Sequence, residues 1–246
     1  MKKILFCLLF ICCFNAAKSQ VLISLLLGDK LNSPNLEFGL DGGVNLGTIQ
    51  GLHDAERFTG FNLGFYFDIK LFKNKNWMFN TGVIVKSPHG AEDLPVYSLN
   101  NTALDSVFVG GKVARKLRYF NVPLAMKYTF KNRIFVKGGV MLGLRYRCFD
   151  EFTNEIEEED DLKFEVDIKD KFHPIDAGGY LGVGYRLMGG NGMNLGVQYY
   201  HGFVDITIDD SGSNEYNDQI YFTVGIPIGK GKAAEKAKAK EVEEQK

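Results

Sequence analysis

Cysteine is scarce in this chain, and its placement excludes two classes of site. The sequence has four cysteines, three of which (Cys7, Cys12 and Cys13) lie in the first nineteen residues. Cys148 is then left alone, so neither an intramolecular disulfide nor a thiolate metal site is expected in the rest of the chain. Proline and tryptophan are also few, at 6 and 1 residues. After residue 19 no uninterrupted apolar run is long enough for a transmembrane helix.

The first nineteen residues have the pattern of a secretory signal peptide. Lys2 and Lys3 precede an apolar stretch that is too short to span a bilayer, and Ala17 and Ser19 supply small residues for cleavage before Gln20. We therefore expect residues 1–19 to be removed and 20–34 to form an N-terminal periplasmic segment. Removal leaves 26 basic residues against 30 acidic ones, a net charge of −4, which argues against nucleic acid as a partner.

Alternation of apolar and polar residues is the strongest pattern in the remaining sequence. In Gly60–Phe72, for example, Phe61 and Leu63 take one face and Asn62 and Asp68 the other. Such alternation is typical of β-strands. Eight runs share it: Asn35–Leu46, Gly60–Phe72, Trp77–Lys86, Lys116–Phe130, Ile134–Arg147, Pro174–Leu187, Met193–Asp205 and Gln219–Ile228.

The chain offers almost no helical pattern that would cover the apolar faces of these strands. Eight strands with an apolar outside and a charged inside instead predict an all-β fold, an eight-stranded antiparallel up-and-down transmembrane β-barrel over 35–229 in the cell outer membrane. The runs are about as long as the 9–11 residues that a tilted strand needs to cross a bilayer. A lipocalin-like soluble barrel is the alternative, but it requires an apolar interior.

Loop lengths predict the orientation. Tight turns are expected at 73–76, 131–133 and 188–192, and long connections at about 48–59, 87–115, 148–173 and 206–218. Short turns are periplasmic in such barrels and long loops extracellular. Residues 230–246 follow as a charged C-terminal tail without an apolar face, which we expect to be mobile in the periplasm.

Charged residues on the inner faces form the candidate site. Because an eight-stranded barrel has room only for packed side chains, charges of both signs are expected to pair there. A structural salt-bridge network is the leading interpretation and a narrow ion path the alternative. Eleven residues are placed in this interior network: Glu37, Asp41, Asp68, Lys70, Lys86, Lys127, Lys137, Arg145, Arg147, Asp176 and Arg186.

No catalytic or cofactor motif emerges from the sequence. The four histidines do not share metal-ligand spacing, and no cofactor is expected. The acidic loop 148–173 predicts a solvated surface, with loose binding of a divalent cation as the alternative. A lipid-modifying enzyme would need a clustered nucleophile and base, for which His201, Ser87 and Ser98 qualify by residue type alone. The leading hypothesis is therefore a non-enzymatic protein.

One strand carries a resemblance to a known family. The stretch Tyr119–Tyr128, with its aromatic, Val-Pro-Leu and Lys-Tyr positions, resembles a strand of small Bacteroidota outer-membrane barrels that include the PorT-like family. That resemblance implies a structural role, or a role accessory to protein secretion (the type IX route) or envelope assembly, with outer-membrane lipid and other envelope or secretion proteins as partners. The alternative is a narrow porin-like or adhesin-like barrel that acts through its extracellular loops. The last strand departs from the family, because it ends Gly225–Ile228 and a charged tail follows where many such barrels end on an aromatic residue.

Overall fold

The computed structural model describes residues 33, 35–52, 55–71, 76–155, 161–187, 192–209 and 212–228. The predicted signal peptide, most of the predicted N-terminal segment 20–34 and the predicted C-terminal tail therefore lie outside the described residues. The elements are β1 (Leu36–Gln50), β2 (Glu56–Lys70), β3 (Trp77–Leu94), α3 (Thr102–Val107), β4 (Lys112–Thr129), β5 (Ile134–Glu155), β6 (Asp161–Asp167), the 3₁₀ turn η2 (Lys169–Lys171), β7 (Ile175–Arg186), β8 (Asn194–Gly202) and β9 (Tyr216–Pro227). No helix in these ranges is long and apolar enough to cross a membrane.

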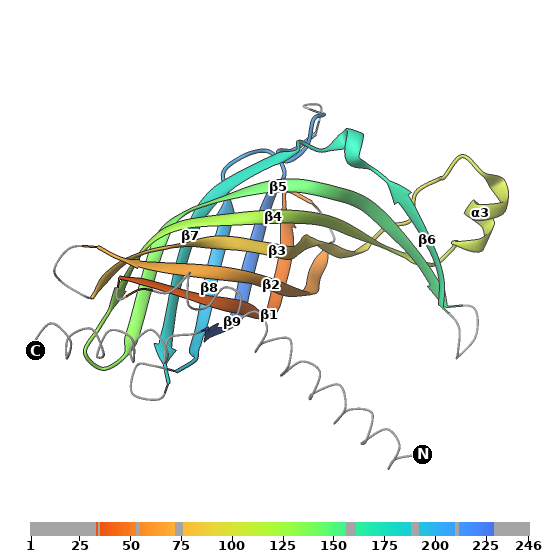
Figure 1. Ribbon diagram of the computed structural model, residues 1–246. Helices are drawn as coiled ribbons and strands as arrows, with labels where there is room; N and C mark the ends of the chain where they lie inside the picture. The colour runs from red at the N-terminus through yellow and green to blue at the C-terminus, as the bar shows by residue number, and fades with distance from the viewer. Residues whose placement is uncertain are drawn as a thin grey trace, which may run out of the picture.

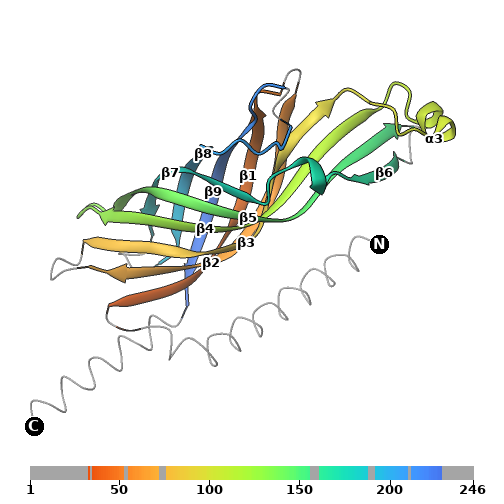
Figure 2. The same cartoon turned by 90° about the horizontal axis from the view of Figure 1, so that it is seen from above.

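Eight antiparallel strands close into a ring, which confirms the predicted barrel. The order is β4-β3-β2-β1-β9-β8-β7-β5, and a pairing between β4 and β5 closes it (Figures 1 and 2). A ninth strand, β6, pairs only with the far end of β5. Closure pairs the two end strands of the sheet with each other, which removes exposed strand edges from the ring.

The outer face is apolar, as the alternation predicts. Leu181, Leu144, Val183 and Phe61 are among the exposed large apolar side chains of the ring, with 63%, 55%, 51% and 49% of their surface accessible. In water such a continuous band would be unfavourable, and in a bilayer it faces hydrocarbon.

Aromatic residues mark both borders of this band. At the tight-turn end, the rings of Trp77 and Tyr128 lie 4.9 Å apart. At the other end, Phe120 stacks on Tyr146 with centroids 4.5 Å apart and an interplanar angle of 28°. Phe120 and Tyr128 lie on the same strand, separated by about the number of residues that a tilted strand uses to cross a bilayer.

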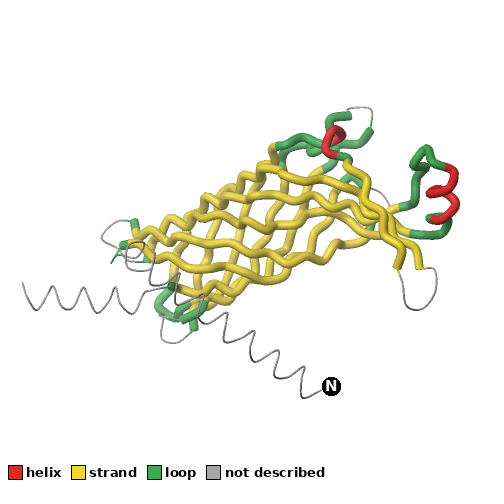
Figure 3. Tube along the Cα trace, turned by 45° about the vertical axis from the view of Figure 1, so that its right-hand side comes forward, coloured by secondary structure: helices red, strands yellow, loops and turns green. Residues whose placement is uncertain are grey.

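Three strands extend well past the ring. β3, β4 and β5 are 18, 18 and 22 residues long, whereas β8 has 9. Together with β6 and α3 they form an extracellular projection (residues 92–116, 149–155 and 161–167), which is visible at the far end from the tight turns (Figures 1 and 3). The prediction of loops at 87–115 and 148–173 is therefore wrong in large part, because β-strands continue into both ranges. The predicted loop at 48–59 is also shorter, since β1 ends at Gln50 and β2 begins at Glu56.

Two β-bulges explain why some faces differ from simple alternation. On β3, Ile84 pairs with Asn121 and Ser87 with Tyr119, so one extra residue lies between them. On β5, Arg147 pairs with Arg118 and Arg145 with Tyr119. Arg118 and Tyr119 are adjacent on β4, so Tyr146 is an extra residue on β5. Each bulge reverses which residues face inward, and strict alternation cannot anticipate it.

Candidate functional site

The interior near the tight turns is held by ion pairs. Lys127 Nζ lies 2.6 Å from Asp68 Oδ2, and both side chains are almost fully buried, at 4% and 0% exposure. Asn80 donates to the second Asp68 oxygen at 2.7 Å, and Lys137 Nζ lies 3.4 Å from the Asn80 amide oxygen. Asp41 lines a cavity of about 20 Å³ together with Asn80, Lys127 and Lys137. Asp68, Asn80, Lys127 and Lys137 therefore each have a polar partner.

A second ion pair lies on the same side of the barrel. The Arg186 guanidinium donates to Glu37 across the ring, from β7 to β1. Tyr66 also donates to Glu37, at 3.2 Å, and Asn194 donates to the Tyr66 hydroxyl at 3.1 Å. Lys70 is half-buried at this end, on the inward phase of β2.

Asp176 also lies in the barrel interior, as predicted, but nearer the long loops, at the start of β7. It has no ion pair among the described residues. It is 1% exposed and accepts a hydrogen bond from Asn217 at 2.8 Å. Arg145 lies on the inward phase of β5, yet its guanidinium donates to the carbonyl oxygens of His173, Lys169 and Phe172 at 2.8–3.2 Å. It fixes a loop rather than pairing with an acid.

Two of the eleven predicted interior residues lie on the outer wall instead. Lys86 is exposed, with its ammonium 5.4 Å from the centre of the outward Phe61 ring. Arg147 is half-exposed and pairs with Glu165 of β6 at 2.5 Å. Both corrections follow from the bulges on β3 and β5, which turn the residues beyond them to the opposite face.

A buried polar hub occupies the middle of the barrel. The His89 Nε2 atom lies 3.2 Å from Ser87 Oγ, 3.0 Å from Asn121 Nδ2 and 3.1 Å from the Tyr221 hydroxyl. His89 and Ser87 are both 0% exposed. The sequence identified Ser87 as a catalytic candidate by residue type alone, and it predicted that Ser87 and His89 lie in a loop. The bulge on β3 is what turns both side chains into the barrel.

Above the hub the interior becomes apolar. Eight buried residues from strands and loops pack together here and form the apolar plug: Ile49, Ala91, Leu117, Tyr119, Cys148, Ile168, Phe172 and Ile206. None is more than 3% exposed. Tyr221 of the hub packs in one cluster with Tyr180 and Tyr200, and all three are at most 1% exposed. The barrel bore is therefore filled with packed side chains at this level.

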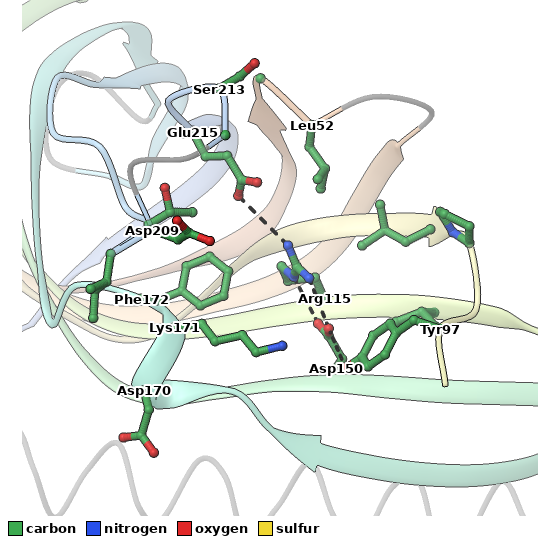
Figure 4. Close-up of a pocket in the computed structure, with 17 residues that line it drawn as sticks. Leu52, Tyr97, Arg115, Asp150, Asp170, Lys171, Phe172, Asp209, Ser213 and Glu215 are labelled. Atoms are coloured by element: carbon green, nitrogen blue, oxygen red, sulfur yellow. Dashed lines mark hydrogen bonds and ion pairs between the residues drawn. The ribbon is translucent and has the colours of Figure 1, made fainter. Parts of the chain in front are cut away.

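Beyond the plug, the mouth of the barrel opens into a cavity of about 910 Å³, here called the mouth cavity. It lies between the projection and the loop 203–215, and its lining mixes apolar and charged groups (Figure 4). Arg115 crosses its floor and donates two hydrogen bonds to Asp150, at 3.0 and 3.1 Å. Glu215 lies on the other side of Arg115, 3.9 Å away.

The electrostatics of this cavity are set by partial burial. Burial, followed by the nearby Asp150 charge, raises the pKa of Tyr97 to about 12, and the Tyr97 hydroxyl donates to Asp150 at 3.1 Å. Burial likewise raises the pKa of Glu215, with Asp205 and Asp150 adding to the effect and Arg115 opposing it. Sequence reasoning missed Tyr97, Arg115 and Glu215 as site residues, and it considered Asp150 only as part of the acidic loop 148–173. The one available signal was the continued alternation of Val113, Arg115 and Leu117 ahead of Tyr119.

The acidic loop does not provide a described metal site. Residues 156–160 lie outside the described residues, and elsewhere in the described ranges no group of three or more His, Cys, Asp or Glu side chains is placed to hold a metal ion. His201, the other enzyme candidate, lies on the outer wall and its Nδ1 atom is 2.7 Å from Asp218. Ser98 hydrogen-bonds to Asp105 at 2.7 Å, next to α3.

Comparison with known proteins agrees with this architecture. The family model described as "outer membrane protein beta-barrel domain" matches residues 30–207. The chain belongs to this family. As an outer membrane protein beta-barrel, it has an ion-paired interior near the tight turns and an apolar interior near the long loops. No protein with a curated description matches the sequence.

Solved structures of small barrels are similar to a limited degree. Ail, the attachment invasion locus protein of Yersinia pestis, aligns with a TM-score of 0.42 and 11% identity over 78% of this chain and 99% of that chain. Neisserial surface protein A gives 0.42 and 11%, over 77% and 96%. OprG from Pseudomonas aeruginosa gives 0.35 and 14%, over 80% and 96%.

Proposed function

We propose that this outer-membrane barrel is a non-conducting, non-enzymatic protein that acts through its extracellular end, as the adhesin-like alternative requires. The observation that carries the proposal is the contrast along the barrel axis. The bore is filled by the apolar plug and by buried tyrosines, whereas the mouth cavity and the projection are open to solvent. A filled bore favours binding over transport.

The projection has the construction of a binding element. Leu94, Phe108, Val113 and Phe152 give it a small core of its own, and none is more than 6% exposed. The helix α3 is fixed at its start by Asn101, whose side chain accepts from two backbone amides at 3.1 and 3.3 Å. A rigid element that carries exposed residues such as Val109 suits recognition of a partner.

The buried hub supports a non-enzymatic role. Ser87 and His89 lie within hydrogen-bond distance, which is the arrangement that an activated nucleophile needs. Both side chains are inaccessible, and Asn121 and Tyr221 also lie within hydrogen-bond distance of Ser87 Oγ and His89 Nε2. His89 Nδ1 is buried and has no hydrogen-bond partner among the described residues. A substrate would have no route to the serine without movement of the surrounding strands, so the hub is proposed as a structural network.

A second candidate is a role accessory to protein secretion or envelope assembly. The PorT-like strand Tyr119–Tyr128 favours it, and this stretch lies on β4 with Pro123 and Lys127 facing inward. A filled barrel with a structured projection is compatible with a subunit that docks other envelope proteins. Loss of protein secretion on deletion of the gene, with restoration by the full chain, is the result that this candidate predicts.

Site-specific crosslinking tests the leading proposal. A photoreactive amino acid at Val109, which is 74% exposed on the projection, is expected to crosslink to an extracellular partner or surface component in intact cells. The same residue at Lys131, in the tight turn between β4 and β5, is the matched control and is not expected to give that product. Products from Lys131 alone would place the functional surface at the periplasmic end and contradict the proposal.

A further inference from the structure

The wall of the barrel has an open seam between β2 and β3. Arg57 pairs with Ala91 and Leu63 pairs with Lys86, and no pairs are formed between these two points. The neighbouring seams continue through the same level, because β1 pairs with β2 at Phe58–Phe61 and β3 pairs with β4 from Ser87 to Ala91. The break is therefore confined to one seam in this part of the described wall.

Pro88 lies on the β3 side of the break. Proline has no backbone N–H to contribute to a ladder, so the missing partner leaves no donor unsatisfied there. Its carbonyl oxygen accepts from the Asn45 side chain of β1 at 2.6 Å. The backbone groups of Pro88 are therefore accounted for at this break.

A cavity of about 480 Å³ lies at this seam. Phe58, Phe61, Pro88 and Tyr146 contribute apolar surface to its lining. Tyr146 belongs to the aromatic border on the long-loop side of the outer apolar band, where it stacks on Phe120. Such borders lie at the level of lipid headgroups, so the cavity faces the outer leaflet at that level.

The charged lining of the cavity is mainly basic. It consists of Lys86, Lys116 and Arg118 against a single carboxylate, Glu92. Lys116 is paired with Glu151 at 2.6 Å. Lys86 and Arg118 instead lie over aromatic rings, those of Phe61 and Phe149, and neither has a carboxylate partner among the described residues.

We propose that this seam binds the phosphorylated glycolipid of the outer leaflet, lipid A. A phosphate fits between Lys86 and Arg118, whose guanidinium suits bidentate phosphate contact. An acyl chain of the same molecule lies along the apolar surface of Phe61 and Tyr146. The β3 bulge is essential to the site, because without it Lys86 would face the barrel interior.

Native mass spectrometry of the full chain in detergent tests the proposal, with purified lipid A as the probe. The double variant K86Q/R118Q is expected to lower retained lipid A by about tenfold or more, since each lost charge-assisted contact weakens binding. K163Q, which removes an exposed lysine on β6 away from the seam, is the matched control and is expected to retain lipid A as the wild type does. Heat-modifiable gel migration verifies that each variant is folded.

Two further measurements distinguish the contribution of the phosphate charges from that of the cavity shape. Removal of both phosphates from lipid A is expected to weaken its binding to the wild type. The binding that remains should be no tighter than the binding of intact lipid A to K86Q/R118Q. Thr59→Trp keeps the cations but fills the cavity, in whose lining Thr59 is exposed, and it is expected to reduce retention as well. Equal retention by K86Q/R118Q and wild type, or equal binding of phosphatidylglycerol and lipid A, would overturn the proposal.

Discussion

The two halves of the barrel interior are built from different interactions. Near the tight turns the core consists of the Lys127–Asp68 and Arg186–Glu37 pairs and their amide and phenol partners. Near the long loops it consists of the apolar plug, which joins strand residues to Ile168, Phe172 and Ile206 from the connecting loops. The periplasmic half thus depends on charge complementarity between strands, and the extracellular half on packing between strands and loops.

This difference shows that the half near the tight turns does not depend on its connecting segments. The ion pairs join strand to strand, so the tight-turn half is complete when the ring closes. The plug draws part of its volume from loop residues, so the same loops that shape the mouth cavity also seal the bore. Changes in the extracellular loops are therefore coupled to the state of the bore in a way that changes in the tight turns are not.

The largest effect is expected from breaking a buried ion pair. Lys127→Met leaves Asp68 fully buried without its cation, which should lower the free energy of unfolding by about 3–5 kcal/mol. Arg147→Met, which breaks the half-exposed pair with Glu165, is the matched control and should cost about 0–1 kcal/mol. Urea unfolding in lipid vesicles measures both values.

A double variant sharpens that result. Asp68→Asn combined with Lys127→Met removes both charges, and it should recover part of the loss because no uncompensated charge remains. Equal costs for Lys127→Met and Arg147→Met would show that the interior pair is solvated and would break the contrast between the two halves.

A slightly smaller effect is expected on the shared outer face. Both halves require the same apolar exterior, and Val140 of β5 is 45% exposed on it. Val140→Arg should cost about 2–4 kcal/mol if the residue lies near the bilayer middle. Val109→Arg on the projection should stay within about 0.5 kcal/mol of the wild type. Vesicle-based unfolding that gives the same value for both variants would show that the outer face is not in hydrocarbon.

The apolar plug predicts a smaller, local change. Ile206→Val removes one methylene from a fully buried loop residue and should cost about 0.5–1.5 kcal/mol. Ile208→Val, at a residue that is 48% exposed two positions along the same loop, is the control and should change stability by less. A larger cost for Ile208→Val would mean that the loop does not pack into the bore as described.

The smallest expected effect is a pH response of the loop 203–215. Burial tends to raise the pKa of Asp205, but hydrogen bonds from the Thr207 and Glu215 amides and the Thr207 hydroxyl lower it below its ordinary value of 3.8 overall. This contribution to stability is present above the unfolded pKa and is lost as the pH falls through the lowered folded pKa. Pepsin cleavage within the loop should therefore increase between pH 4.5 and pH 2.5, after correction for pepsin activity on a denatured control.

Asp205→Asn is the matched variant for that experiment. It removes the titrating group, so its cleavage should already be raised at pH 4.5 and should change little on further acidification. A pH response in the variant as large as that in the wild type would assign the effect to another group.

The sequence predicted the membrane-spanning ring well and the strand ends near the long loops poorly, and both outcomes have physical reasons. On β2, alternation correctly placed Phe61 outside and Asp68 inside, because a regular strand fixes every second side chain to one face. It misplaced Lys86 and Arg147, since a bulge adds one residue without a signal in hydrophobicity. It also missed the strand ends that carry Arg115 and Asp150, because a sheet that has left the membrane no longer needs an apolar outer face.

Single-channel recording in planar bilayers tests the central claim most directly. The bore is filled by the apolar plug and the tyrosines beneath it, so the folded full chain is predicted to give no steady conductance above the bilayer baseline. Stable, reproducible conductance steps from the folded wild-type protein would contradict the account and would favour a narrow porin-like function.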